Sequence, residues 1–378
     1  MRTWFKRLGI ALLVLIVYLL IWPVPVQPVE WHAPVSRGYL GAFARNERLA
    51  GARLVSIAPD AGPEHIVFGS DGRLYTGTTS GAILRMNADG SGLETFVTTG
   101  GRPLGLAFDA DGRLIVADAR RGLLAVQLDR SVIVLTDSVA LEPILFADGV
   151  AVASDGRIVF TDATTRFSPQ DHGVFDAAVL DLLEHSCTGR VLEFDPSTSA
   201  TRIIASGLCF PNGVLLSDDE QTLLVAETGT YRILRVARGA NVLDADKALG
   251  LHDPAVSVLM DNLPGVPDNL TRGTDGRYWV GFTKPRDATT DRLADWPLLR
   301  EIAARLPRFM WPVPPDYGHV MAFDAAGRVV LDLQDPAAHL PGTSGATEHN
   351  GRLYLQSPYA PALGILDLSA VPASPRAP

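Results

Sequence analysis

The sequence is poor in lysine and cysteine and has an excess of acidic residues. Three lysines and two cysteines occur among 378 residues, and 42 acidic side chains outnumber 33 basic ones, for a net charge of −9. A chain this acidic is poorly suited to bind the phosphates of nucleic acid, so we expect no nucleic-acid partner. Two cysteines exclude a small disulfide-dense fold and a zinc site made only of cysteine.

The motifs of several enzyme classes are also missing. The sequence has no G-x-S-x-G nucleophile motif and no glycine-rich phosphate loop, and its eight histidines show no zinc-type spacing. Its 47% hydrophobic and 20% charged residues are nevertheless typical of a chain that folds around a large core. Function therefore has to be inferred from the arrangement of the remaining residues.

One long hydrophobic run lies near the N-terminus at residues 8–22, after basic residues. Together with Trp4 and Phe5 it covers residues 4–22, which approaches the ~30 Å hydrocarbon core of a bilayer. No small-residue cleavage site follows, so we favour an uncleaved signal anchor over a cleaved signal peptide. The basic flank would stay in the cytoplasm and place the body on the periplasmic or extracytoplasmic side.

The anchor sets the expected domain boundaries. Residues 1–28 would hold the cytoplasmic basic residues, the anchor and the start of a tether, and residues 29–50 the rest of that tether. The folded body would cover residues 51–370, followed by a disordered tail at 371–378.

The body contains a repeated pattern in which a tight turn separates two apolar, strand-like runs. The turns are Asp71-Gly72, Asp111-Gly112, Asp155-Gly156, Asp219-Glu220, Asp275-Gly276 and Asn350-Gly351. Asp-Gly and Asn-Gly turns are strong hairpin signals, and the shorter of the spacings between them suit four-stranded propeller blades. We therefore predict an all-β, six-bladed β-propeller in which residues 51–57 complete the last blade. A β-sandwich of unrelated hairpins is the alternative.

A constant offset from these turns predicts a site. The residues seven positions before each turn are Glu64, Leu104, Asp148, Asn212, Asp268 and Thr343. Because innermost strands begin at one face around the propeller axis, we expect Glu64, Asp148, Asn212 and Asp268 to converge. Three clustered carboxylates need a cation to stay ionised, and oxygen ligands favour calcium. The alternative is that these polar residues cap strand ends or line a watery channel.

Two insertions with helical periodicity, at 172–186 and about 284–317, each follow the second strand of a blade. That position puts them at the face of the predicted metal site, so we expect them to wall or cover its mouth. Contact of their apolar stripes with the membrane, or plain packing on the propeller, stays open. Asn269 and His319 are our candidates for substrate binding at the mouth.

The two cysteines lie almost symmetrically about a turn near Thr198. Antiparallel pairing would bring Cys187 and Cys209 to one end of a hairpin, where a disulfide could form in an oxidising compartment. A slip of one residue would place them on opposite faces, so the sequence leaves the bond open.

Residues 189–227 and 263–283 resemble the conserved region of strictosidine synthase-like proteins. The stretches 62–64, 101–105 and 348–351 resemble the adipocyte plasma membrane-associated branch of that family. The resemblance implies a six-bladed propeller related to gluconolactonases and paraoxonases, which bind calcium in the central channel and hydrolyse lactones or aryl esters. It implies Glu64, Asn212 and Asp268 as ligands, and Asp148 stands where the family normally has asparagine.

We therefore expect a membrane-anchored, calcium-dependent hydrolase of small esters or lactones, with Asp268 or Asp148 as general base toward water. One alternative is a non-catalytic propeller that binds a ligand or partner around a structural calcium. Another is a strictosidine synthase-like enzyme that lacks the condensation glutamate, because residues 343–347 contain no carboxylate.

Overall fold

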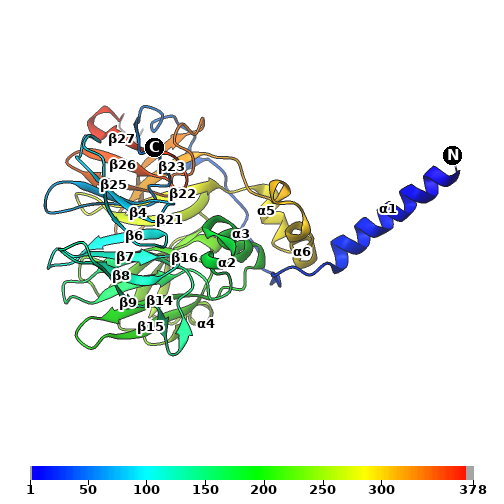
Figure 1. Cartoon of the computed structure of the whole chain (residues 1–378), viewed down its shortest axis with the longest axis horizontal. Coiled ribbons are helices and arrows are strands. Elements are labelled where there is room, and N and C mark those ends of the chain that lie inside the picture. The colour runs from blue at the N-terminus through cyan, green and yellow to red at the C-terminus, as the bar shows by residue number, and fades with distance from the viewer. Residues whose placement is uncertain (1, 372–378) are drawn as a thin grey trace.

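The computed structural model describes residues 2–371 and shows six β-sheets arranged around a central axis, with one long helix projecting from them (Figure 1). It confirms the six-bladed propeller. All of the expected disordered tail except Val371 lies outside the described residues.

Each of the first three blades is an antiparallel meander whose innermost strand comes first in the sequence. Blade 1 contains β2 (Ile66–Phe68), β3 (Leu74–Gly77), β4 (Ala82–Met86) and β5 (Glu94–Thr98). Blade 2 contains β6 (Pro103–Phe108), β7 (Leu114–Asp118), β8 (Gly122–Val126) and β9 (Val132–Thr136). Blade 3 contains β12 (Ala147–Val152), β13 (Ile158–Asp162), β14 (Gly189–Asp195), β15 (Ala200–Leu208) and the short parallel strand β19 (Leu243–Asp244).

The last three blades follow the same pattern. Blade 4 contains β16 (Pro211–Leu216), β17 (Thr222–Glu227), β18 (Arg232–Ala237) and β20 (Val256–Met260). Blade 5 contains β21 (Gly265–Arg272), β22 (Tyr278–Pro285), β23 (Gly318–Phe323) and β24 (Val329–Asp335). Blade 6 contains β25 (Gly345–His349), β26 (Arg352–Gln356), β27 (Ala362–Asp367) and β1 (Arg53–Ser56).

The ring is closed by pairing the N-terminal part of the body with its C-terminal part. Strand β1 runs antiparallel to β27, with Arg53 opposite Ile365 and Ser56 opposite Ala362. This is the closure that the sequence predicts for residues 51–57, and it leaves no blade with a missing outer strand.

Apolar side chains fill the spaces between neighbouring blades. Six buried clusters of the described residues each join two consecutive blades, including the pair formed by blades 6 and 1. A seventh cluster lies on one face of the propeller and joins Phe146 and Phe210 to helix α3 (Val174–Glu184). Burial of this apolar surface is the main favourable term that holds blades and insertion together.

The remaining elements are short, apart from the first helix. Two short strands, β10 (Ser138–Val139) and β11 (Glu142–Pro143), pair with each other between blades 2 and 3 and belong to neither blade. The other helices and turns are η1 (Gly41–Phe43), α2 (Pro169–His172), η2 (Thr228–Thr230), α4 (Ala245–Gly250), α5 (Ala288–Leu293), α6 (Pro297–Arg305), η3 (Arg308–Met310) and η4 (Leu368–Ala370). Among residues 2–371, only α1 (Arg2–Ile21) is long and apolar enough to cross a membrane.

We define the cap as α2, α3, α5, α6 and η3. Both predicted insertions form it, because α2 and α3 follow β13 and the other three elements follow β22. In Figure 1 these helices lie together on the side of the propeller from which α1 departs.

Residues 23–46, here termed the strap, connect α1 to the body and pack against the cap. The backbone N–H groups of Gln27 and Val29 each donate a hydrogen bond to Glu184, at 2.8 Å. Val26 is 2% exposed, and the Trp31 ring stacks on the His185 ring with centroids 4.0 Å apart. The segment expected to be a tether is therefore part of the folded structure.

Candidate functional site

The innermost strands of blades 2–5 share an irregularity at the residue that the repeat places near the axis. In each, the pairing with the second strand shifts register across Leu104, Asp148, Asn212 or Asp268. A β-bulge turns the side chain at that position out of the ordinary alternation of a strand. The repeated bulge explains how one register position comes to face the axis in successive blades.

A glycine follows three of these positions and allows neighbouring blades to approach closely. A Cβ atom placed on the glycine would lie near the carbonyl oxygen of the next blade's site residue: 2.3 Å for Gly105 and Asp148, 2.5 Å for Gly149 and Asn212, and 2.7 Å for Gly213 and Asp268. No larger residue fits without moving the backbone, so these glycines set the spacing of the site residues.

The four predicted oxygen-bearing residues line the bottom of one cavity, and we call them the floor: Glu64, Asp148, Asn212 and Asp268. Each is buried, with 3 to 8% of its surface exposed. Each also has one side-chain oxygen without a hydrogen-bond partner among the described residues: Glu64 Oε2, Asp148 Oδ1, Asn212 Oδ1 and Asp268 Oδ1. Buried polar atoms are rarely left unpaired, so this cluster requires an explanation.

The electrostatics of the floor favour a cation. Burial raises the pKa of Asp148 and Asp268 well above their ordinary values, and the charge of Glu64 raises both further. Burial also raises the pKa of Glu64, against the opposing charge of Arg102. Burial lowers the pKa of Arg102 to about 10, against the opposing charges of Glu64, Asp118 and Asp148. Carboxylate and amide oxygens with this excess of negative charge fit a calcium ion.

The two remaining register positions, Leu104 and Thr343, supply no ligand to the floor, and the proposed substrate residue Asn269 does not line the cavity. Leu104 lines the cavity without offering a ligand, whereas Thr343 is fully buried and accepts a hydrogen bond from the His319 backbone at 2.7 Å. The Asn269 side chain donates to Glu64 Oε1 at 2.7 Å and to the Glu64 carbonyl oxygen at 2.9 Å. Asn269 therefore orients a floor residue instead of lining the cavity.

His319 is also placed away from the cavity. It lies on β23, the third strand of its blade, and is 1% exposed. Its Nε2 is 2.6 Å from Asp332 Oδ1, and its ring stacks on Phe282. Our expectation that His319 reaches the mouth is wrong because two strands separate the third strand from the axis.

The cavity above the floor has a volume of about 690 Å³. Its walls are mostly apolar and come from the propeller face, the strap and the cap, with Phe146, Phe210, Val179, Leu182 and Leu293 among them. The cap therefore covers the predicted metal site, and a ligand in this cavity would meet oxygen atoms at one end and apolar side chains along its length.

Sequence reasoning missed a charged cluster in the cavity wall. Lys284 Nζ lies 2.5 Å from Asp316 Oδ1, and the Tyr359 hydroxyl donates to the same oxygen. Burial acts to raise the pKa of Asp316, but these two hydrogen bonds outweigh it and the pKa is lowered. Lys284 and Asp316 stand at the two ends of the second insertion. The ends of an insertion must meet at its base, so this signal could have revealed the pair.

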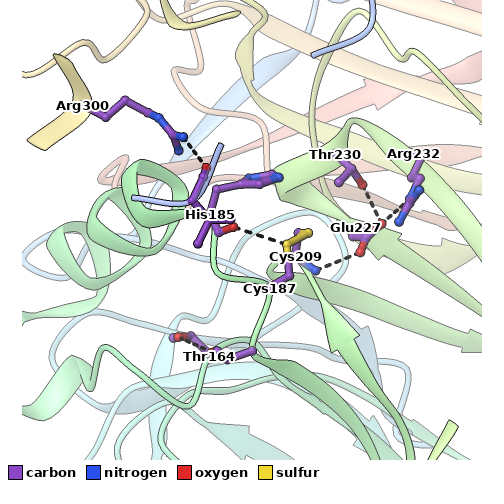
Figure 2. The surroundings of a disulfide bond; sticks show 10 residues. Thr164, His185, Cys187, Cys209, Glu227, Thr230, Arg232 and Arg300 are labelled. Carbon is purple, nitrogen blue, oxygen red and sulfur yellow. Dashed lines mark hydrogen bonds and ion pairs between the residues drawn. A yellow bond between two sulfur atoms is a disulfide. The ribbon is translucent and has the colours of Figure 1, made fainter. Parts of the chain in front are cut away.

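A disulfide joins the cap to the strand that carries Asn212. Cys187, after α3, is bonded to Cys209, which precedes β16 (Figure 2). The backbone N–H of Cys209 donates to Glu227 Oε1 at 2.8 Å. His185 lies beside the bond, and burial lowers its pKa to about 3, so its ring is neutral. The bond that the sequence left open therefore links cap and floor covalently.

Sequence comparisons give the family. The strictosidine synthase profile matches residues 148–238, and the N-terminal profile of strictosidine synthase-like proteins matches residues 41–86. Adipocyte plasma membrane-associated proteins of Danio rerio and Homo sapiens are 30% and 31% identical over 98% of this chain, covering 90% and 91% of their own lengths. The chain belongs to the strictosidine synthase-like family. STRICTOSIDINE SYNTHASE-LIKE 7 of Arabidopsis thaliana is 31% identical over 79% of this chain and 76% of its own.

Solved structures show that this member of the strictosidine synthase-like family shares its fold with lactonase-type propellers. A gluconolactonase from Xanthomonas campestris aligns with a TM-score of 0.58 at 21% identity, covering 92% of this chain and 99% of that one. Regucalcin from Agrobacterium tumefaciens, described as a calcium-binding protein, aligns with a TM-score of 0.55 at 13% identity, covering 84% and 93%. The apolar α1 and the plasma membrane-associated relatives indicate membrane anchoring.

Proposed function

We propose that this protein is a membrane-anchored, calcium-dependent hydrolase of small, fairly apolar esters or lactones. The observation that supports this proposal is the floor, where four buried oxygens without hydrogen-bond partners lie at the end of a mostly apolar cavity. Through these oxygens Glu64, Asp148, Asn212 and Asp268 would hold the ion. The shared fold with a gluconolactonase and a calcium-binding propeller is consistent with this chemistry.

Each floor residue would have a separate role in hydrolysis. A bound calcium ion would supply positive charge that polarises the ester carbonyl and offsets the charge developing on its oxygen. Asp268 or Asp148 would accept the proton of the attacking water at a carboxylate oxygen. Asn212 would orient the substrate or the ion through its amide oxygen.

The walls would select the substrate. Phe146 and Phe210 lie above the floor in the apolar cluster that joins propeller and cap, and Val179 and Leu182 face the cavity from α3. These side chains would pack against the alkyl or aryl part of an ester and exclude bulk water from the floor. The wall also carries charged side chains, but Lys284, Arg286 and Arg308 are already paired with acidic residues, so a strongly charged substrate would have to compete for them.

The N-terminal residues support an extracytoplasmic orientation. Arg2, Lys6 and Arg7 would stay in the cytoplasm, which would place the propeller on the other side of the membrane. The Cys187–Cys209 bond is consistent with this orientation, because disulfides persist in oxidising compartments.

The cluster of Lys284 and Asp316 is a reason to consider a condensation enzyme as a second candidate. Such chemistry needs an acid or base in the mouth beyond the metal ligands, and this pair lies in the cavity wall. However, Asp316 is engaged by both Lys284 and Tyr359, and its lowered pKa makes it a weak base. Hydrolysis therefore has the better support.

The test uses the full-length protein in nanodiscs, because the strap is packed into the fold and truncation would remove buried groups such as Val26. A panel of aryl esters and lactones is assayed as purified, after EDTA, and after calcium is restored. We expect turnover that EDTA abolishes and calcium restores. If calcium raises the melting temperature while no ester or lactone is turned over, the protein is a non-catalytic binder with a structural ion.

A further inference from the structure

The cap has an inner surface that lines the cavity and an outer surface that is apolar and exposed. On α6 and its N-cap, Arg300 and Ala303 are buried, while Trp296, Leu298 and Leu299 are 60%, 55% and 44% exposed. The next element, η3, exposes two more large apolar side chains: Phe309 at 87% and Met310 at 51%. Five large apolar side chains on one continuous segment are more than scattered surface exposure, and we call them the outer patch.

The outer patch is held beside the end of the membrane helix. The Tyr18 hydroxyl donates a hydrogen bond to the carbonyl oxygen of Arg305 at 2.8 Å, and Arg305 Nε donates to the carbonyl oxygen of Trp22 at 2.6 Å. These two bonds fix the C-terminal end of α6 against the last turn of α1. Figure 1 shows α6 as the cap helix next to α1.

This contact fixes the depth of the patch relative to a bilayer. The 20 residues of α1 extend about 30 Å, which matches the hydrocarbon core, so both helix ends reach the interfacial layers. Tyr18 lies three residues before the end of α1, about 4.5 Å inside it. Because the end of α6 is bonded to Tyr18, it lies at the level of the helix's last turn, where the hydrocarbon core meets the interfacial layer.

We infer that the outer patch docks into the bilayer interface and that the cavity receives its substrate from the membrane. Continuity with α1 selects the bilayer as the occupant. The patch also contains Trp296, of a residue type that favours the boundary between lipid and water. Residues of the same insertion line the cavity from inside, namely Leu293, Arg300 and Pro312. The substrate class is then a lipophilic ester or lactone dissolved in the bilayer, an assignment that rests on the proposed function.

The docking is tested by measuring depth, without any assay of activity. The native cysteines are bonded to each other, so a single new cysteine in the full-length protein can carry a fluorophore that reports on polarity. Phe309→Cys and Leu299→Cys probe the patch. Leu128→Cys is the control, because Leu128 is 77% exposed in the turn between β8 and β9, on the opposite face of the propeller. Nanodiscs of phosphatidylcholine and phosphatidylglycerol supply the bilayer.

We expect lipid-borne nitroxide to quench the labels at 309 and 299, and aqueous iodide to quench the label at 128. Labels at 309 and 299 that iodide quenches as strongly as the control would overturn the docking. Labels shielded from both quenchers would overturn it too, because a second copy of the chain or another protein would then cover the patch.

The substrate route has its own test. Because Trp296 and Phe309 are exposed and lie outside the cavity wall, Trp296→Ser with Phe309→Ser should leave the melting temperature unchanged. We expect turnover of a long-chain ester in the nanodisc to fall several-fold, and that of a short, water-soluble ester to stay the same. An equal fall for both esters would refute membrane delivery. If wild type turns over neither, the proposed function fails and with it the substrate class, while the quenching data still decide the docking.

Discussion

The floor and the cap of the cavity are built from different kinds of sequence. The floor consists of one register position repeated in successive blades, with a bulge at Asp148, Asn212 and Asp268 and a following glycine at the first two of these. The cap consists of two insertions that share no repeat, held by an apolar cluster, a disulfide and the strap. Because the floor position is fixed by the repeated strand geometry, its residues can shift little. The insertions are not part of the repeat, so the residues of the cavity wall can change without altering the strands. The metal site and the substrate pocket can therefore change independently.

The strongest test of this separation removes one floor charge. Asp268→Asn keeps the shape of the side chain but loses a carboxylate, so we expect turnover to fall by about 10²–10⁴-fold. The calcium-dependent rise in melting temperature should shrink, while the calcium-free protein should gain stability because repulsion in the floor is relieved. Activity assays and thermal unfolding with and without calcium measure both effects. A variant as active as wild type would refute a catalytic floor.

Removal of the disulfide tests the link between the two regions. Cys187→Ala with Cys209→Ala opens a bond that spans 22 residues, and loop-closure entropy predicts a loss of about 3 kcal/mol in unfolding free energy. The calcium-dependent rise in melting temperature should persist, because the β16 bulge and Gly213 place Asn212 independently of the bond. If that rise disappears, the cap is needed to position the floor and the comparison fails.

The difference between a repeated floor and a non-repeated cap also explains which site residues could be predicted from the sequence and which could not. The floor was predictable because turns recur and a fixed offset from them reaches the same structural position in each blade. Asn269 was misplaced because the bulge directs Asp268 to the cavity and leaves its neighbour to hydrogen-bond with Glu64. Arg102 and Lys284 were missed because neither stands at the repeated position. The repeat therefore gave no signal for either residue, although Lys284 could have been found from the two ends of the second insertion.

A third test addresses the spacing of the floor. Gly149→Ala would place a Cβ atom 2.5 Å from the Asn212 carbonyl oxygen, so we expect a loss of about 1–3 kcal/mol in unfolding free energy and a smaller effect of calcium. The matched control is Gly250→Ala at the end of α4, where nothing lies within 4 Å of the added atom. Denaturant unfolding measures the unfolding free energies of the two variants. Equal values would show that neighbouring blades can move apart at Gly149 without loss of stability.

The smallest effect at neutral pH is expected from Asp181, a buried carboxyl of the cap that forms no direct ion pair with another described residue. Burial raises the pKa of Asp181 on α3 to about 7, although Thr164 donates a hydrogen bond that opposes this. Between pH 3.8 and about 7 the folded carboxyl keeps a proton that the unfolded one has lost, so the contribution of Asp181 to the unfolding free energy falls as pH rises through that window. Asp181→Asn should remove this negative contribution to the slope, as measured by chemical unfolding of variant and wild type across that window at saturating calcium.

The control for this slope is a carboxyl whose pKa is shifted in the opposite direction. Burial acts to raise the pKa of Glu348, but hydrogen bonds from Arg277, Thr274 and Trp279 lower it to about 2. Its contribution is complete above pH 4.5 and is lost only as pH falls toward 2, so Glu348→Gln should leave the slope between pH 4.5 and 7 unchanged. If Asp181→Asn also leaves that slope unchanged, the proton is not held in the cap. The contrast between an ion-balanced floor and a proton-balanced cap would then be wrong.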